Sequence, residues 1–160
     1  MRRQVRTTGE TEALGAQLAR ARPGGEELTV VFLCGELGAG KTTFVRGYLR
    51  ALGVTAVVRS PTYTLVELYP VGAMTVVHAD LYRVRDAAEL EPLGLRDWAQ
   101  RGHLWFIEWP ERGTGHLPAP DLRLSFSAAP AAHTVELKAA SVFGERWLRN
   151  LETGSDGGLS

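Results

Sequence analysis

Apolar residues in the first third of the chain follow two different spacings. They recur at helical spacing after a Thr-x-x-Glu capping box that begins at Thr7, which predicts a helix over residues 10–21. Residues 28–34 form a continuous apolar run, which is typical of a strand buried on both faces of a sheet. After a glycine-rich turn, a second helical stripe runs from Lys41 to a stop at Gly53. The pattern therefore predicts helix, strand, loop and helix.

The middle of the chain favours a hairpin followed by two short helices. Residues 62–69 and 73–78 have strand-like patterns and are separated by a Pro-Val-Gly turn, which predicts an antiparallel pair. A short helix is expected to begin at Asp86 and to be limited by Pro92, and another is expected over 95–101. The sheet should therefore be mixed.

The last third of the chain returns to strands and closes with a helix. Residues 104–107 are all apolar and predict a second buried strand that ends at Glu108. Residues 122–126 and 134–137 predict a second hairpin, and apolar residues at helical spacing over 143–151 predict a final helix. Strands interleaved with helices favour an α/β fold, a three-layer sandwich with a mixed, partly parallel sheet.

Length and composition indicate one domain. A chain of 160 residues with 44% hydrophobic content is sufficient for a single core. We expect this domain to cover residues 1–152 and residues 153–160 to be a disordered tail. The 18 basic and 18 acidic side chains cancel, so any contact with nucleic acid should be local or shared with another protein.

Targeting signals are not evident in the sequence. No apolar run has the length of a signal peptide or of a membrane span. The single cysteine, Cys34, cannot form an internal disulfide and lies in an apolar run, where a reduced thiol is expected. We therefore expect a cytoplasmic protein that is neither exported nor embedded in a membrane.

The glycine-rich turn contains a phosphate-binding motif. Residues 35–42, Gly-Glu-Leu-Gly-Ala-Gly-Lys-Thr, match G-x-x-x-x-G-K-[ST] between the predicted buried strand and the predicted helix. Backbone amides of such a loop converge on phosphate oxygens, Lys41 would reach the β- and γ-phosphates, and Thr42 would offer its hydroxyl to Mg²⁺. The residues predicted to hold the nucleotide are Glu36, Leu37, Gly38, Ala39, Gly40, Lys41, Thr42 and Thr43.

The motif alone does not choose the nucleotide. A glycine-rich turn can fit the pattern by chance, and such a loop also attracts a simple phosphate without reading a base. No Asn/Thr-Lys-x-Asp motif of guanine-binding proteins occurs in the chain. This absence favours ATP, and the expected cofactors are ATP or ADP together with Mg²⁺.

Two carboxylates are candidates to complete a magnesium site. Asp80 and Glu108 each follow an apolar strand and would project from its carboxyl end, where open α/β sheets bind ligands. Each carboxylate could instead cap a following helix. Thr62 lies in a Ser-Pro-Thr-Tyr-Thr segment where P-loop proteins often sense the γ-phosphate, and it could orient water or bind Mg²⁺. The alternative for Thr62 is a polar turn before a strand.

Three neighbouring residues have less specific interpretations. Arg83 could neutralise charge in a transition state, but an ion pair at the surface is the simpler interpretation. His78 and Trp109 are interpreted as packing residues. No cysteine and histidine cluster suggests zinc.

A set of motifs in fixed order resembles the bacterial TsaE, or YjeE, family. The motifs are Gly-Glu-Leu-Gly-Ala-Gly-Lys-Thr-Thr at 35–43, Ser-Pro-Thr-Tyr-Thr-Leu at 60–65, His-Ala-Asp-Leu-Tyr-Arg at 78–83, Leu-Gly-Leu at 93–95 and Ile-Glu-Trp-Pro-Glu at 107–111. The likeness extends from about Thr11 to Phe126. Beyond Phe126 the match is in layout and not in residues.

The resemblance implies an ATPase subunit that is required to make threonylcarbamoyladenosine in tRNA. It implies TsaD and TsaB as protein partners, weak hydrolysis by the subunit alone, and contact with tRNA only through the complex. It also implies that Lys41 and Thr42 bind phosphate and Mg²⁺, that Asp80 and Glu108 occupy the acidic positions, and that Thr62 lies in a switch-like segment. Trp109 matches a tryptophan beside the site, and Glu36 stands where many members have Asp.

Two other functions remain open from the residues alone. A small-molecule kinase of this size would use the same loop, with arginine-rich lid residues and a phosphoryl acceptor. A nucleotide-dependent switch would bind ATP and change partners without needing hydrolysis. Both alternatives share the phosphate loop, so it does not distinguish between them.

Overall fold

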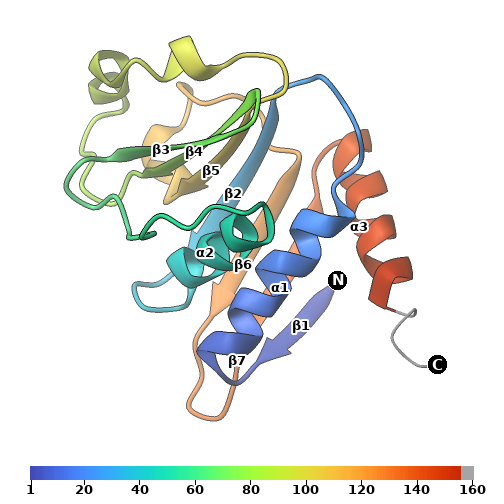
Figure 1. The fold of residues 1–160 in the computed structure, drawn as a ribbon. Helices are drawn as coiled ribbons and strands as arrows, with labels where there is room; N and C mark the ends of the chain where they lie inside the picture. The colour runs from blue at the N-terminus through green and yellow to red at the C-terminus, as the bar shows by residue number, and fades with distance from the viewer. Residues whose placement is uncertain (156–160) are drawn as a thin grey trace.

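One seven-stranded mixed sheet runs through the molecule in the order β1-β7-β6-β2-β5-β4-β3 (Figure 1). The computed structural model describes residues 1–155. Strands β6, β2, β5 and β4 are parallel to one another, whereas β3 and β7 pair antiparallel at the two sides and β1 pairs antiparallel with β7. The strands are β1 (Arg2–Val5), β2 (Thr29–Gly35), β3 (Val66–Val71), β4 (Met74–Asp80), β5 (Leu104–Glu108), β6 (Leu122–Ser127) and β7 (His133–Ala139).

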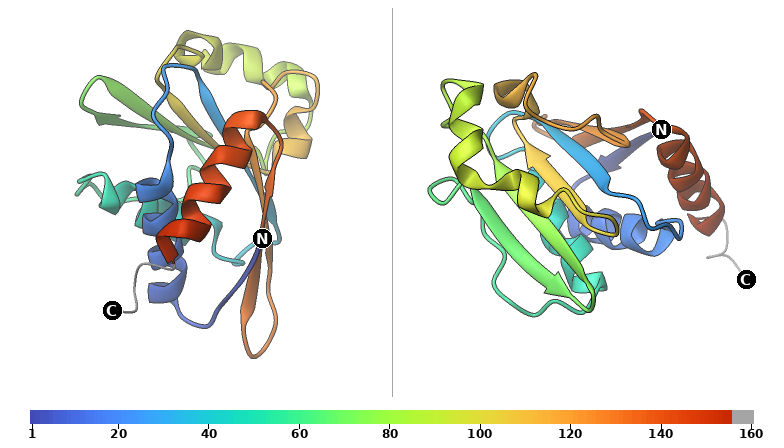
Figure 2. Two further views of the ribbon diagram at one scale, coloured as in Figure 1. Left: turned by 90° about the vertical axis from the view of Figure 1, so that its right-hand side faces the viewer. Right: turned by 90° about the horizontal axis from the view of Figure 1, so that it is seen from above.

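Helices cover both faces of the sheet but differ in kind (Figure 2). One face packs against the three α-helices, which are α1 (Thr8–Ala21), α2 (Lys41–Ala51) and α3 (Val142–Ser155). The opposite face of β2, β5 and β4 packs under a cluster that includes residues of the short 3₁₀ helices Ala87–Leu93 and Leu95–Trp98. A third short 3₁₀ helix, Pro110–Gly113, follows β5. The predicted α/β fold with a mixed, partly parallel sheet is confirmed, with 3₁₀ helices in its third layer.

Close packing of α1 and α2 sets the position of the helix that follows the glycine-rich loop. A Cβ atom added at Gly47 would lie 2.0 Å from the Glu12 carbonyl oxygen, and one added at Gly15 would lie 2.2 Å from the Phe44 carbonyl oxygen. The two helix backbones therefore approach at distances that only glycine permits. Arg46 also forms an ion pair with Glu12 at 3.5 Å across the same contact. The start of α2 is held firmly over the sheet.

The predicted elements are confirmed with shifted ends, and two predictions need correction. Residues 62–65 are not part of the hairpin, because a turn in which the Leu65 amide donates to the Pro61 carbonyl, with Leu65 at a φ of 65°, delays β3 until Val66. The helices predicted from Asp86 and over 95–101 are short 3₁₀ helices, since Pro92 removes a backbone donor and Gly94 ends the first in a left-handed conformation.

The two ends of the chain also differ from the expectation. Strand β1 was not predicted, because only Val5 of its residues is buried and the strand exists through backbone pairing with β7. At the other end α3 continues to Ser155, so the predicted boundary at residue 152 falls inside a helix. The remainder of the predicted tail, 156–160, lies outside the described residues. Within residues 1–155 no helix is both long and apolar enough to traverse a lipid bilayer.

Candidate functional site

The glycine-rich loop joins the carboxyl end of β2 to the first turn of α2. Gly35 has a φ of 138°, and a Cβ atom there would lie 2.3 Å from the Phe126 carbonyl oxygen of the neighbouring strand β6. Gly40 precedes the helix in a left-handed conformation with a φ of 105°. Both positions exclude larger residues, so the motif glycines have a physical reason in this structure.

The amino end of α2 presents backbone donors that its own helix does not use. The first helical bond runs from the Phe44 amide to the Gly40 carbonyl at 2.9 Å, so the amides of residues 41–43 precede the hydrogen-bonded turns. No side chain caps this end of the helix. Free amides and the positive end of the helix dipole together attract an anion.

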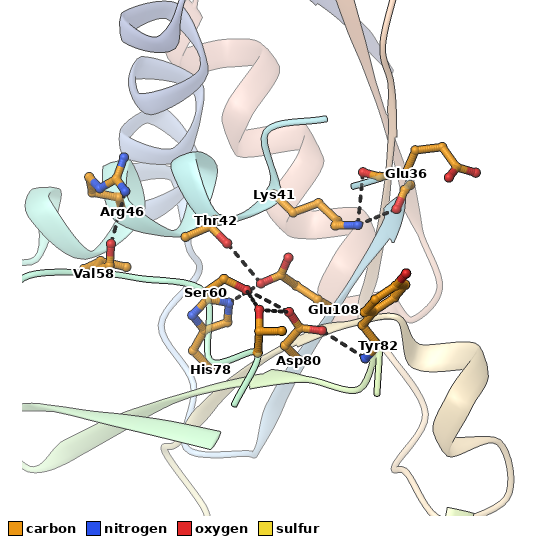
Figure 3. A network of polar contacts seen from close by, with 12 residues as sticks. Glu36, Lys41, Thr42, Arg46, Val58, Ser60, His78, Asp80, Tyr82 and Glu108 are labelled. Carbon is orange, nitrogen blue, oxygen red and sulfur yellow. Dashed lines mark hydrogen bonds and ion pairs between the residues drawn. The ribbon is translucent and has the colours of Figure 1, made fainter. Parts of the chain in front are cut away.

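Lys41 lies at this end of the helix with its ammonium group inside the loop (Figure 3). Its side chain is nearly buried, with 4% of the residue exposed. The Nζ atom donates to the Gly35 carbonyl, donates to the Glu36 carbonyl at 3.4 Å and lies 4.5 Å from the centre of the Trp109 ring. Within residues 1–155 no carboxylate forms an ion pair with Lys41, so its charge is available to an anionic ligand.

The two candidate carboxylates lie side by side on neighbouring parallel strands. Strands β4 and β5 pair in register, which places Asp80 opposite Glu108. Each of these residues is only 3% exposed. Neither follows the alternative interpretation of a helix cap, because neither is the cap of a helix in the described part of the chain.

Glu108 contacts Thr42 at the start of α2 and a buried histidine. Its Oε2 atom accepts a hydrogen bond from the Thr42 hydroxyl at 3.3 Å and lies 2.6 Å from His78 Nε2 (Figure 3). His78 is completely buried. The structure therefore joins Thr42 and Glu108, both predicted, to His78, which the sequence interpretation had treated only as a packing residue.

Asp80 is bound to the segment between α2 and β3. Its Oδ2 atom accepts a hydrogen bond from the Ser60 hydroxyl at 2.7 Å, and Thr62 Oγ1 lies at a longer 3.5 Å. The Tyr82 amide donates to Oδ1 at 3.0 Å. Ser60 and Thr62 are themselves linked by a hydrogen bond of 3.0 Å between their hydroxyls. Ser60 is thus the nearer partner, and the sequence had singled out only Thr62.

Aromatic residues form one wall of the site. Trp109 has a φ of 56°, a left-handed conformation that is rare for a residue with a large side chain. This conformation places its ring near Lys41 and 5.0 Å from the ring of Tyr82. Arg83, for which an ion pair was expected, instead lies 4.4 Å above the exposed ring of Tyr63. That expectation was wrong because an aromatic face is the nearer partner.

A small cavity opens on the other side of the loop. It has a volume of about 200 Å³ and is lined by residues 5–8, Thr11, Gly38, Gly40, Thr43 and His133. Residues 5–8 connect β1 to α1, and His133 begins β7. None of these residues outside the loop was predicted to belong to a site, because nothing in the sequence shows that the ends of β1 and β7 meet the loop.

The donor set beside the loop fits Mg²⁺. Asp80 and Glu108 are buried carboxylates that form no ion pair with lysine or arginine in residues 1–155, and the Thr42 hydroxyl adjoins them. Oxygen ligands of this kind are those that Mg²⁺ prefers, with phosphate and water completing its coordination. In the same residues no cluster of three or more His, Cys, Asp or Glu side chains could hold a metal on its own.

Comparison with known proteins identifies the family. Residues 5–135 match the family model described as threonylcarbamoyl adenosine biosynthesis protein TsaE. This match confirms the resemblance over Thr11 to Phe126 and extends it at both ends. Proteins named tRNA threonylcarbamoyladenosine biosynthesis protein TsaE include one from Haemophilus influenzae, 42% identical over 120 residues that cover 75% of this chain and 76% of the relative.

Other relatives and a solved structure agree with this match. The protein of that name from Streptomyces coelicolor is 36% identical over 139 residues, which cover 84% of this chain and 91% of the relative. The crystal structure of Bacillus subtilis YdiB superposes with a TM-score of 0.78 at 27% identity and covers 97% of this chain and 95% of its own. On these matches, this chain belongs to the TsaE family of threonylcarbamoyladenosine biosynthesis proteins.

Proposed function

We propose that this protein binds Mg-ATP on loop 35–42 and hydrolyses it as the ATPase subunit required for threonylcarbamoyladenosine modification of tRNA. One observation carries the proposal. The uncapped amino end of α2, the ammonium group of Lys41 and two buried carboxylates all meet at the carboxyl ends of β2, β4 and β5. A polyanion with a divalent cation is the ligand that matches this combination of charges.

Binding of the phosphates follows from the geometry of the loop. The amides of residues 36–43 line the loop and the first turn of α2, and Lys41 already lies inside it. The Lys41 ammonium contacts two carbonyl oxygens and the Trp109 ring. When a nucleotide binds, Lys41 would replace these carbonyl contacts by charge-assisted hydrogen bonds to the β- and γ-phosphates. Because such bonds are stronger, they favour the nucleotide-bound protein.

The nucleoside is proposed to lie in the cavity beside Thr43. The cavity adjoins Gly38, Gly40 and Thr43, so a phosphate chain in the loop would lead directly into it. Residues 5–8 line the cavity on the side away from the loop, and His133 adds a ring. A competition experiment between ATP and GTP for the same site tests this position, with preferential binding of ATP expected.

Hydrolysis would use the two carboxylates and the segment bound to Asp80. Mg²⁺ beside Thr42 and Glu108 would neutralise charge that develops on the phosphate oxygens. Asp80 and Thr62 would orient the attacking water, whose oxygen bonds to the γ-phosphorus as the bond to the bridging oxygen of ADP breaks, and the water proton would pass to the released phosphate. Ser60 holds Asp80 in position for this step through its 2.7 Å hydrogen bond.

The partners are proposed from the family. The chain carries the phosphate site but equal numbers of acidic and basic side chains, so it has no overall charge with which to hold tRNA alone. We therefore assign tRNA contact to a complex with TsaD and TsaB in the cytoplasm, with hydrolysis dependent on that complex.

Two measurements test the proposal. Calorimetry with Mg²⁺ should detect binding of ADP and ATP to the isolated protein, and failure to bind either would overturn the assignment. ATP turnover should rise when TsaB and TsaD are added, and equal rates with and without them would contradict dependence on the complex.

A nucleotide-dependent switch is the second candidate, and the hydrogen bonds from Ser60 and Thr62 to Asp80 favour it. They link the segment 60–64 to the site, so a bound γ-phosphate could change the position of that segment. The variant Glu108→Gln separates the candidates. If it cannot hydrolyse ATP but still supports tRNA modification, binding alone is sufficient.

A further inference from the structure

His78 is a buried polar residue at the site to which the proposed function gives no role. It lies on β4 two positions before Asp80, so both side chains are on the same face of the sheet. None of its surface is exposed, and its Nε2 atom lies 2.6 Å from Glu108 Oε2. Its other ring nitrogen, Nδ1, has no hydrogen-bond partner in the described part of the chain.

We infer that His78 is a positioning residue that fixes the carboxylate of Glu108 toward the metal and phosphate side of the site. This inference rests on the proposed function. The Nε2–H group donates to Oε2, which leaves Oε1 of Glu108 free for Mg²⁺ or for a water bound to it. A buried carboxylate that a histidine holds by one oxygen loses rotational freedom before any ligand arrives.

The surroundings determine which ring nitrogen carries the proton. If Nδ1 carried the proton, its N–H group would be a buried donor without a partner. The unprotonated Nε2 would then face Glu108 Oε2, and two acceptors in contact repel each other. A proton on Nε2 satisfies both Nε2 and Glu108 Oε2 and leaves only a weak acceptor unpaired. The contact is therefore a hydrogen bond that His78 Nε2–H donates to Glu108 Oε2.

Within residues 1–155 no other hydrogen bond of the Glu108 side chain can replace this one. The second donor to Oε2 is the Thr42 hydroxyl at 3.3 Å, which is a longer bond. Thr42 is also the proposed metal ligand, so its hydroxyl oxygen would turn toward Mg²⁺ when the site is loaded. His78 is then the group that keeps Glu108 oriented in both states.

Two substitutions with different reach test the role of His78. The amide nitrogen of glutamine in His78→Gln reaches the position of Nε2, whereas the amide of asparagine in His78→Asn is too short. We expect His78→Asn to lower the Mg²⁺-dependent gain in ADP affinity by about 10-fold, in the range seen when partners of metal ligands are removed. ADP affinity measured in EDTA should stay within about 2-fold. His78→Gln should recover most of the metal-dependent gain.

A matched control separates positioning from loss of a buried histidine. His103 is also nearly buried, but its Nδ1 accepts from the Thr75 amide at 2.9 Å, at the opposite end of β4. His103→Asn should leave the metal-dependent gain unchanged. For turnover in the complex, His78→Asn should lower kcat more than it alters KM, because the carboxylate is misplaced while the phosphate loop is intact.

The outcomes distinguish this inference from the proposed function. If the unsubstituted protein does not bind nucleotide, the proposed function fails. If it binds and the metal-dependent gain is equal in His78→Asn and the unsubstituted protein, the positioning role of His78 is wrong. The same conclusion follows if His78→Gln is as defective as His78→Asn. Thermal unfolding of each variant identifies any that do not fold, and the comparison of Gln with Asn is then made at a temperature where both are folded.

Discussion

The carboxyl ends of β4 and β5 carry equally buried carboxylates that have different partners. Asp80 and Glu108 are opposite each other in register, and each is 3% exposed. Glu108 is joined to Thr42 on the P-loop helix and to His78 within the sheet. Asp80 is joined to Ser60 in the segment before β3. Neighbouring strands thus connect the site to two separate parts of the chain.

This difference indicates a division of roles between the two carboxylates. The partners of Glu108 lie on a helix and a strand that are packed into the core, so Glu108 has a rigid support. Asp80 depends on hydroxyls of an irregular segment that contains Leu65 at a φ of 65°. Residues on irregular segments move more readily than those on packed elements. We therefore expect Glu108 to serve the metal and the chemical step and Asp80 to couple that step to segment 60–64.

The largest effect is expected at Glu108, the carboxylate with the rigid support. Glu108→Gln keeps the shape of the side chain but removes its charge, so it should lower ATP turnover in the complex by about 100-fold or more. ADP binding measured in EDTA should be retained, because Lys41 and the amides of the loop remain, whereas the Mg²⁺-dependent gain in affinity should be lost. Steady-state turnover and calorimetry on the same preparation check this prediction, and near-normal turnover would contradict the role of Glu108.

The next largest effect is expected at Lys41, which serves the phosphates and neither carboxylate in particular. Lys41→Ala should weaken nucleotide affinity by about 10-fold or more, since a hydrogen bond to a charged group is worth about 1.5–3 kcal/mol. Lys138→Ala is a suitable control, because Lys138 forms only an exposed pair with Glu136 at 3.5 Å. Calorimetric titration with ADP should show the loss for Lys41 alone. Equal affinities in the two variants would remove Lys41 from the site.

A smaller effect on turnover is expected at Asp80, whose partners lie on the irregular segment. Asp80→Asn should lower turnover by about 10-fold, because the amide keeps the shape of the side chain but holds the water and Ser60 less strongly. It should also increase hydrogen exchange of backbone amides in residues 60–65, because the carboxylate no longer accepts charge-assisted bonds from that segment. Glu108→Gln should not change exchange there. If both variants increase exchange in residues 60–65 equally, the proposed division of roles between Asp80 and Glu108 is wrong.

The smallest effects should rank the two hydroxyls that contact Asp80. Ser60→Ala removes a 2.7 Å hydrogen bond, whereas Thr62→Ala removes a contact at 3.5 Å. A hydrogen bond to a charged group is worth about 1.5–3 kcal/mol, but Asp80 keeps its bond from the Tyr82 amide, so only part of this should be lost and turnover should fall by about 2- to 10-fold for Ser60→Ala. A greater loss in Thr62→Ala would show that Thr62 contacts the water or phosphate directly. Initial rates of phosphate release in the complex measure both.

The sequence predicted those parts of the site that are encoded over short distances. The loop from Gly35 to Thr42 is contiguous, and its glycines, lysine and threonine are specified by their spacing. Asp80 and Glu108 were identified because each follows an apolar run that predicts a buried strand. The partners of these groups were harder to predict, since Ser60 and His78 resemble an ordinary turn residue and an ordinary packing residue.

By itself, the sequence determined the α/β class, the glycine-rich loop between strand and helix and the ends of the buried strands, because these depend on periodicity and on residues that are close along the chain. Only the tertiary structure decided that β4 pairs in register with β5, that His78 faces Glu108 and that β1 and β7 bring residues 5–8 and His133 to the loop. These relationships join residues that are far apart in the chain. Their physical cause is strand pairing and packing, which local pattern does not encode.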